Sequence, residues 1–151
     1  ATRLLKARGV DFALLLYDYV DHGGTTRAAQ ELGVAEHAVI KTLVFEDEAK
    51  RPVLVLMHGD REVSLKGLAR ALGVKTVAPC TPEAAQRHTG YQVGGISPFG
   101  TRKQLPVYAE RSIFALPEIC INAGKRGALA RMDPRHLREL LDAKDVDVGR
   151  D

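Results

Sequence analysis

The sequence predicts a mixed α+β fold in a single domain that spans residues 1–151. First, short segments bounded by helix caps alternate with short apolar segments typical of strands. Second, two apolar runs at 39–45 and 53–58 flank a charged segment, which is the pattern of a hairpin. Third, no repeat or linker divides the chain, whose length is common for one domain. Because a hairpin interrupts the alternation, a continuous parallel sheet is less expected than a mixed one.

In the first half of the chain, caps and turn residues mark the expected boundaries. A glycine directly after an apolar periodic segment is typical of a helix end, and Ser or Thr directly before one is typical of a start. The expected elements are a helix at 2–8, a buried strand at 12–19, a helix from Thr25 or Thr26 to Leu32, the two hairpin strands, and a helix at 65–72 capped by Ser64.

The second half shows the same kinds of signal around a long segment without regular structure. Proline is favoured at the first position of a helix, which marks Thr81-Pro82 and Asp133-Pro134 as starts. The expected elements are a short strand at 74–78, a helix from Thr81 to His88, strands at 107–109 and 119–122, a helix from Asp133 to Leu141, and a fraying tail at 146–151.

Composition indicates a cytoplasmic protein with no membrane partner. Hydrophobic residues make up 45% and charged residues 27%, which is ordinary for a globular domain. No apolar run approaches the roughly 20 residues that a membrane span needs. The first ten residues carry Arg3, Lys6 and Arg8 and lack the apolar core of a signal peptide. The net charge of +3 permits a polyanionic partner without implying one.

Cysteine and histidine spacing predicts no disulfide, no structural metal and no cofactor. Cys80 and Cys120 are the only two cysteines and lie far apart, without a CxxC pair. The five histidines include no HxxxH pair and no cysteine partner at ligand spacing. A GxSxG elbow is missing, and Cys80 with His88 lacks the third member of a triad.

Residues 90–100, GYQVGGISPFG, contain four glycines and a proline, which predicts a shaped loop. A plain connector between strands is the alternative. Glycines let a ligand approach backbone N–H groups, and such donors stabilise the oxyanion that forms when an ester is cleaved. Arg102 and Lys103 place two cations directly after the loop.

Lys41 and the segment 122–127 are the other candidates for chemistry. Strand alternation places Lys41 on one face with Val39, Leu43 and Phe45, where a lysine is costly to bury without a partner. From this pattern alone, a lysine that reaches solvent at the strand end is the simpler interpretation. Residues 122–127, NAGKRG, follow an apolar strand and can hold a phosphate or form a solvated turn.

Residues 91–106, YQVGGISPFGTRKQLP, resemble the signature loop of the YbaK/EbsC family of free-standing aminoacyl-tRNA deacylases. That family is related to the editing domain of bacterial prolyl-tRNA synthetases. Three further blocks agree in order, IKTL at 40–43, LARALGV at 68–74 and NAGKRG at 122–127. The resemblance runs from about Phe12 to the C-terminal helix. It implies a mixed, partly barrel-like sheet with short helices packed outside.

The implied function is trans-acting hydrolysis of the ester of mischarged tRNA, with Cys-tRNA(Pro) as the expected substrate. The implied partners are the acceptor end of charged tRNA and a synthetase such as prolyl-tRNA synthetase. The resemblance also implies that no protein side chain attacks, so water or the substrate's own side chain is the nucleophile. The alternatives are a non-catalytic tRNA- or nucleotide-binding module, an editing enzyme for another small amino acid, and a hydrolase of small esters.

The resemblance assigns site residues. It implies that Lys41 holds the terminal adenosine and that Gly94 and Gly95 orient the ester carbonyl. Tyr19 is a rival to Tyr17 for the pocket tyrosine. The expected substrate-binding residues are Tyr17, Thr42, Ile96, Ser97, Pro98, Asn122 and Gly124, and the expected phosphate contacts are Arg102, Lys103, Lys125 and Arg126.

Three departures from the family pattern affect the walls that select the amino acid. The loop 21–26 is shorter and lacks an expected aromatic residue. Leu129 stands where an acidic residue is often found, and Asn122 stands where serine is common. These changes leave the choice of amino acid open.

Overall fold

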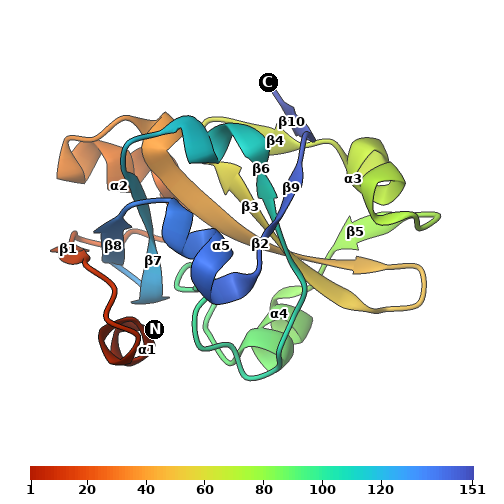
Figure 1. Cartoon of the computed structure of the whole chain (residues 1–151), viewed down its shortest axis with the longest axis horizontal. Helices are drawn as coiled ribbons and strands as arrows, with labels where there is room; N and C mark the ends of the chain where they lie inside the picture. Colours follow the sequence, from red (N-terminus) through yellow and green to blue (C-terminus); the bar gives the residue numbers. More distant parts are fainter.

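The computed structural model describes residues 1–151 and shows a mixed sheet surrounded by short helices (Figure 1). The strands of the main sheet follow the order β1-β8-β7-β2-β3-β6-β9, and β5 pairs with β2 beside this path. The β2–β7, β3–β6 and β6–β9 pairs are parallel, and the other pairs are antiparallel, which confirms the predicted fold class. The strands are β1 Ala13–Leu16, β2 Val39–Asp47, β3 Pro52–His58, β5 Val77–Pro79, β6 Val107–Glu110, β7 Ile119–Lys125, β8 Ala128–Met132 and β9 Lys144–Val146.

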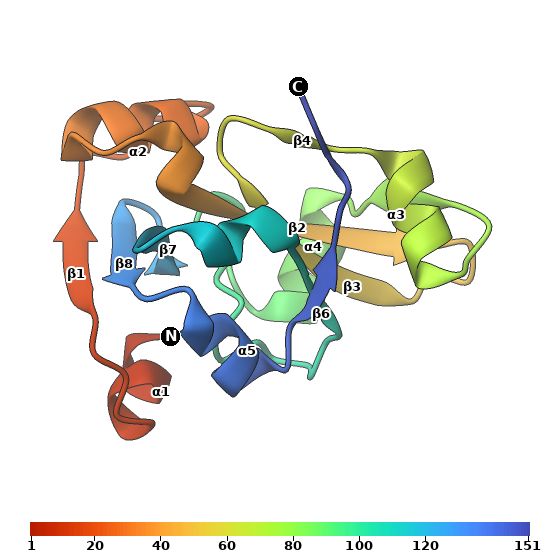
Figure 2. The same cartoon turned by 45° about the horizontal axis from the view of Figure 1, so that its top comes forward.

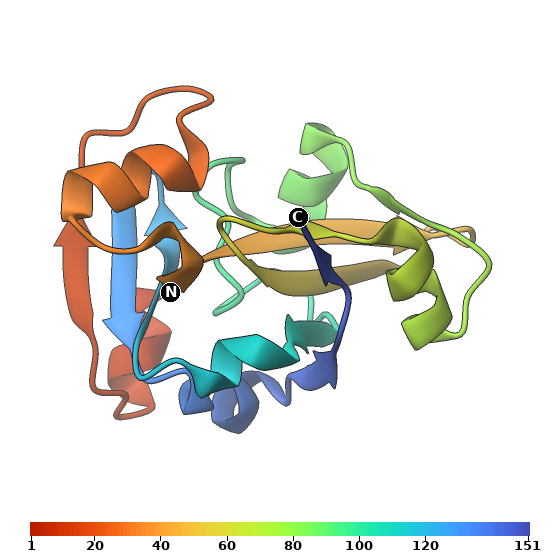
Figure 3. The ribbon, with the colours of Figure 1, turned by 90° about the horizontal axis from the view of Figure 1, so that it is seen from above.

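The helices cover the sheet from several sides. Figure 3 shows α2 over the β1–β8 end and α3 at the opposite end beside β2 and β3. In the same view, α4 lies on one side of the β2–β3 pair, and α5 lies on the other. No helix has the length and apolar character needed to cross a bilayer. The helices are α1 Thr2–Ala7, α2 Gly24–Leu32, α3 Leu65–Leu72, α4 Pro82–Thr89 and α5 Arg135–Leu141, with 3₁₀ turns η1 Glu36–Ala38 and η2 Arg111–Ala115.

The predicted Ser64 cap and the predicted helix start at Thr81-Pro82 are confirmed. The Ser64 hydroxyl accepts from the Gly67 N–H (3.1 Å), and the Thr81 hydroxyl accepts from the Ala84 N–H (3.2 Å). The prediction for α2 was wrong, because this helix begins at Gly24 without a side-chain cap. The Thr25 hydroxyl instead donates to the Glu36 carboxylate at 2.7 Å. A hydrogen bond to a charged acceptor is stronger than one between neutral groups.

The first and last segments differ most from their predictions. Residues 12–19 are not a buried strand, because β1 covers only 13–16 at the sheet edge, with Leu14 49% and Leu16 70% exposed. Residues 146–151 are not a fraying tail. Val146 and Val148 are buried in the core beneath α3, and β10 (Gly149–Arg150) pairs with β4 (Glu62–Val63). Figure 2 shows this end of the chain crossing from β9 toward β4.

A buried carboxylate holds the C-terminal segment in place. Glu110 is only 2% exposed and accepts from the N–H groups of Val148 and Gly149, both at 2.8 Å. Hydrogen bonds to a charged acceptor are stronger than neutral ones, and a buried carboxylate left without donors is costly. The tail is therefore fixed by a contact between residues far apart in sequence.

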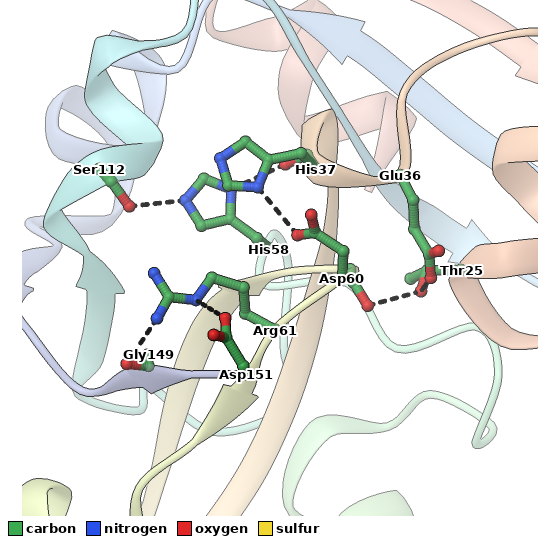
Figure 4. Close-up of polar contacts among 10 residues, drawn as sticks. Thr25, Glu36, His37, His58, Asp60, Arg61, Ser112, Gly149 and Asp151 are labelled. Carbon is green, nitrogen blue, oxygen red and sulfur yellow. Dashed lines mark hydrogen bonds and ion pairs between the residues drawn. The ribbon is translucent and has the colours of Figure 1, made fainter.

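A histidine pair connects η1, β3 and η2 (Figure 4). The His37 and His58 rings stack with centroids 3.7 Å apart. His58 donates from Nδ1 to the His37 carbonyl (2.7 Å), so Nε2 is unprotonated and accepts from the Ser112 hydroxyl (2.7 Å). Asp60 bonds to Nδ1 of His37 at 2.8 Å. The network fixes the residues directly before β2, the strand that carries Lys41.

His58 of this network and His88 of α4 are expected to make folding stability depend on pH. Burial lowers the pKa of His58, outweighing the hydrogen bond to the His37 carbonyl, and burial followed by the nearby Lys103 charge lowers the pKa of His88. Unfolded histidine titrates near pH ~6.5, so below that pH the unfolded chain binds more protons than the folded chain. The free energy of unfolding is therefore expected to fall between about pH 6.5 and the lowered values in the folded protein.

Urea unfolding at about pH 7.5 and about pH 5.5 measures this loss, with the midpoint falling at the lower pH. In His58→Asn the fall is expected to shrink to the part that His88 contributes. His22→Asn, which replaces an exposed histidine, is the matched control. An undiminished fall in His58→Asn would show that His58 is not a source of the pH dependence.

Candidate functional site

A cleft of about 760 Å³ opens where β2 has no neighbour on one edge. Strand β7 pairs with β2 only at Val39 and Ile40, and β5 pairs only from Phe45 onward. Val44 accepts at that edge from the Cys80 N–H (2.9 Å). Residues 41–43 therefore have no partner strand on this edge, although they pair with β3 on the other. The walls come from the end of β1, from α2, from the segments around β4 and β5, from the glycine loop and from the β7–β8 hairpin.

Lys41 and Thr42 lie at the centre of this unpaired edge. The half-buried Lys41 lines the cleft and takes part in no salt bridge, so its charge is available to a bound anion. The Thr42 hydroxyl is buried and has no hydrogen-bond partner. Leaving such a group unpaired costs about 1–3 kcal/mol.

The backbone of Thr42 faces the same opening. Strand backbone groups alternate between the two edges, and the Val44 carbonyl points to the β5 side. The N–H and C=O of Thr42, two residues earlier, therefore point to that side also. The predicted alternation of side chains is confirmed from Ile40 to Phe45, because Ile40 and Val44 belong to one core cluster and Leu43 and Phe45 to another.

The glycine loop approaches this edge and needs its glycines for two different reasons. Gly94 has φ +91°, and a Cβ there would lie 2.6 Å from the Tyr19 hydroxyl oxygen. A Cβ on Gly95 would lie 2.8 Å from the backbone nitrogen of Arg126. Separations below about 3 Å between such atoms are repulsive, so both positions exclude a side chain.

The loop offers fewer free donors than the sequence predicts. The Gly95 N–H donates to the Gln92 carbonyl at 2.8 Å, so it is not available to orient a substrate carbonyl. The Gly94 N–H has no acceptor in the protein, and Gly94 lines the cleft. The expectation that both glycines supply donors is therefore corrected to Gly94 alone, because the tight turn uses the second N–H.

Asn122 connects the loop to the β7–β8 hairpin. Its amide nitrogen lies 3.2 Å from the Gly94 carbonyl and 3.3 Å from the Lys125 carbonyl. Its side-chain oxygen accepts from the N–H groups of Gly124 (2.6 Å) and Lys125 (3.1 Å). All of these contacts are internal, so Asn122 positions Gly94 and leaves little hydrogen-bonding capacity for a ligand.

Both candidate tyrosines line the cleft, and the hydroxyl of Tyr19 lies beside Gly94 of the glycine loop. The Arg126 guanidinium lies 4.9 Å from the Tyr19 ring centroid and donates from Nε to the Val93 carbonyl (2.9 Å). Burial, followed by the neighbouring Tyr19, raises the pKa of Tyr17, which keeps its hydroxyl neutral. Both tyrosines therefore stay candidates for the pocket tyrosine, and Tyr19 is the one placed beside the loop.

The structure brings about half of the predicted residues together. Ser97 is fully buried and accepts from the Phe99 N–H (3.2 Å), so it shapes the loop from inside. Lys103 bonds to His88 at the base of the loop. The cleft is lined by Lys41, Gly94, Tyr17, Thr42, Ile96, Asn122 and Arg126, but not by Gly95, Ser97, Pro98, Gly124, Arg102, Lys103 or Lys125.

Several lining residues were missed by sequence reasoning. Gly24, Thr25 and Ala28 of α2 form one wall, and their helical spacing gave no sign of a ligand. Arg150 also lines the cleft, and it was missed because residues 146–151 were predicted to be a fraying tail. Leu129 is buried against Ala28 beneath α2 and leaves that part of the cleft apolar and uncharged.

One further cluster of reactive side chains adjoins the cleft. Glu46, Cys80 and His88 each offer a metal-ligand atom, and these atoms lie within 4.8 Å of one another. Burial, followed by the Glu46 charge, raises the pKa of Cys80 to about 11. A thiol with this pKa stays protonated near neutral pH and is a poor nucleophile.

Comparison with known proteins identifies similar sequences. Residues 23–140 match the family model described as "Aminoacyl-tRNA editing domain". A protein of Enterococcus faecalis, described as "Putative Cys-tRNA(Pro)/Cys-tRNA(Cys) deacylase EbsC", is 32% identical over 128 residues, covering 85% of this chain and 78% of that protein. A proline–tRNA ligase of Nitratidesulfovibrio vulgaris is 32% identical over 117 residues, which are 78% of this chain and 19% of the ligase.

Solved structures show the same architecture. A hypothetical protein, APE2540, superposes with a TM-score of 0.90 at 27% identity, covering 99% of this chain and 98% of that one. A structure described as "a putative trans-editing enzyme for prolyl tRNA synthetase" superposes with a TM-score of 0.85 at 27% identity, covering 99% and 94% of the two chains.

Proposed function

The chain belongs to the aminoacyl-tRNA editing domain family, and on that premise we propose that it hydrolyses the ester of mischarged tRNA in trans, with Cys-tRNA(Pro) as the first substrate to test. The observation that supports this most directly is that Lys41 and Gly94, whose N–H has no acceptor in the protein, line one cleft. A cation and a backbone donor at one opening suit a ligand that carries phosphate and an ester carbonyl.

The proposed reaction uses electrostatics and positioning. Water, or a nucleophilic substrate side chain, adds to the ester carbonyl, whose oxygen becomes negatively charged. The Gly94 N–H stabilises that charge, and Lys41 holds the terminal adenosine. The C–O bond to the ribose then breaks, the ribose hydroxyl takes up a proton, and the amino acid leaves. The protonated Cys80 thiol is consistent with a mechanism that has no covalent enzyme intermediate.

The wall beneath α2 supports a small amino acid as the group removed. Ala28, Val39 and Leu129 are buried together there and carry no charge. An apolar wall discriminates weakly between side chains that differ by one methylene or hydroxyl, so this wall favours small size over chemical identity. Alanine is therefore the main competitor to cysteine.

A group of cations supports binding of the acceptor stem. None of Arg102, Lys103, Lys125 and Arg126 takes part in a salt bridge. Arg126 lines the cleft, and the other three lie in the adjoining loop and hairpin. Unpaired cations release counterions when they contact phosphates, so tRNA binding is expected to weaken as salt increases.

The deciding experiment incubates purified protein with Cys-tRNA(Pro), Ala-tRNA(Pro) and Ser-tRNA and follows loss of the ester. Faster loss than without protein, for at least one substrate, supports the proposal. Salt-sensitive tRNA binding without turnover on any of the three would replace it with a non-catalytic binding module. Equal turnover of an aminoacylated acceptor-stem mimic and the full tRNA would indicate a hydrolase that does not need the tRNA body.

A further inference from the structure

Glu46, Cys80 and His88 converge at the β5 end of the cleft, outside the proposed ester site. One ligand atom from each lies within 4.8 Å of the other two, and Cys80 Sγ is 3.8 Å from Glu46 Oε2. Zinc binds thiolate at about 2.3 Å and imidazole or carboxylate at about 2.0–2.2 Å, so its tetrahedral ligands lie roughly 3.5 Å apart. We propose that these three residues form a site for one soft divalent cation of the Zn²⁺ class.

The backbone holds the three ligands in place before any ion binds. Glu46 lies in β2 and pairs with Ala78 of β5. Cys80 directly follows β5, and its N–H donates to the Val44 carbonyl at 2.9 Å. His88 is buried in the last turn of α4, the helix whose first turn Thr81 caps. Modest side-chain movement therefore brings the ligand atoms to coordination distance without refolding.

The protonation states also suit a metal. Lys103 Nζ lies 3.2 Å from His88 Nδ1, so this nitrogen is an acceptor and the ring is neutral, the form that binds metals. Lys50 contacts only Oε1 of Glu46 (3.1 Å), which leaves Oε2 beside the thiol. On binding, the Cys80 proton passes to solvent, and the thiolate and carboxylate together neutralise the dication.

Two cationic side chains, Lys103 and Arg87, lie near the proposed Zn²⁺ site. Lys103 is exposed, so its side chain can leave the imidazole, and Arg87 acts on Cys80 only through its charge. Cys80 lines the cleft with Pro79, Pro82 and Ala85, which gives the ion a path from solvent. The fourth coordination position then belongs to water, as in zinc sites with three protein ligands.

The sequence predicts no structural metal because it contains no CxxC or HxxxH pair and no histidine with a cysteine partner at ligand spacing. Glu46, the third member of the cluster, lies 34 residues before Cys80. The β2–β5 pairing creates the cluster in three dimensions. Its chemistry is independent of ester cleavage, so it can be tested whether or not the protein removes amino acids from tRNA.

The test titrates tag-free protein with Co²⁺ and with Zn²⁺ in competition with a chromophoric chelator. One ion per chain and a thiolate-to-cobalt charge-transfer absorption are expected. Cys80→Ala is expected to lose this absorption and to bind Zn²⁺ at least about tenfold more weakly, since even outer contacts of metal sites contribute that much. Cys120→Ala, which removes the chain's other thiol, is the matched control and is expected to behave as wild type.

Glu46→Gln provides a second measurement that keeps both thiols. It is expected to retain the charge-transfer absorption and to bind Zn²⁺ more weakly. Circular dichroism of each variant verifies that it is folded. Loss of the absorption in Cys120→Ala rather than in Cys80→Ala, or wild-type Zn²⁺ affinity in folded Cys80→Ala or Glu46→Gln, would overturn the proposed site.

Discussion

Replacing Lys41 with alanine is expected to reduce deacylation roughly 100- to 1,000-fold, the loss typical when one preorganised electrostatic contact is removed from a transition state. The lysine lies on the unpaired edge of β2 and has no carboxylate partner. Its charge is therefore not neutralised within the protein and acts on whatever occupies the cleft. Because no salt bridge is lost, the urea midpoint is expected to change little.

The measurement is single-turnover cleavage of the preferred aminoacyl-tRNA by wild type and variant. Lys66→Ala is the matched control, because it removes an exposed lysine of α3 that does not line the cleft. Equal rates for Lys41→Ala and wild type would show that this lysine does not contribute to catalysis, and the proposed mechanism would be wrong.

Replacing Gly94 with alanine is expected to lower activity by at least about 100-fold and to destabilise the protein by about 1–3 kcal/mol. The residue has φ +91°, where side chains are strained, and its new Cβ would lie 2.6 Å from the Tyr19 hydroxyl oxygen. Relief of this contact must move either the ring or the loop. Movement of the loop displaces the one free N–H that the proposal assigns to the ester carbonyl.

Gly9→Ala separates backbone strain from the clash. Gly9 has φ +69°, but a Cβ there meets no atom within 4 Å, and it does not line the cleft. It is expected to lose stability without loss of activity. Activity is measured well below each unfolding midpoint, so that unfolded protein does not contribute. Wild-type activity in Gly94→Ala would exclude a requirement for this loop geometry.

Local signals account for the elements that the sequence predicts well. The hairpin at β2 and β3 follows from two apolar runs around a charged segment, and the pairing of Lys41 with Met57 is part of it. Ser64 and Thr81 cap their helices because each hydroxyl finds an N–H three residues later. The hairpin and the two caps depend on residues close together in the sequence, so the sequence alone is enough to predict them.

Long-range contacts account for what the sequence does not reveal. The tail reads as fraying because nothing near Val148 indicates that Glu110 accepts its N–H from 38 residues away. The sequence predicts a buried strand at β1 because an apolar run does not reveal whether the strand lies at the edge of a sheet or inside it. The internal bonds of Gly95 and Asn122 depend equally on tertiary packing, so residue type alone overestimates how many groups face a ligand.

On one edge of β2, the unpaired stretch between β7 and β5 limits the size of the ligand that can bind there. With one strand residue per ~3.3 Å, the bare stretch from Lys41 to Leu43 exposes about 10 Å of rim. Extending the β5 pairing toward Thr42 by a single register step would shorten this unpaired stretch while Lys41 and Thr42 stay unchanged. The size of ligand that this fold accepts can therefore change with the number of residues that β5 pairs with β2, without a change in the side chains that line the cleft.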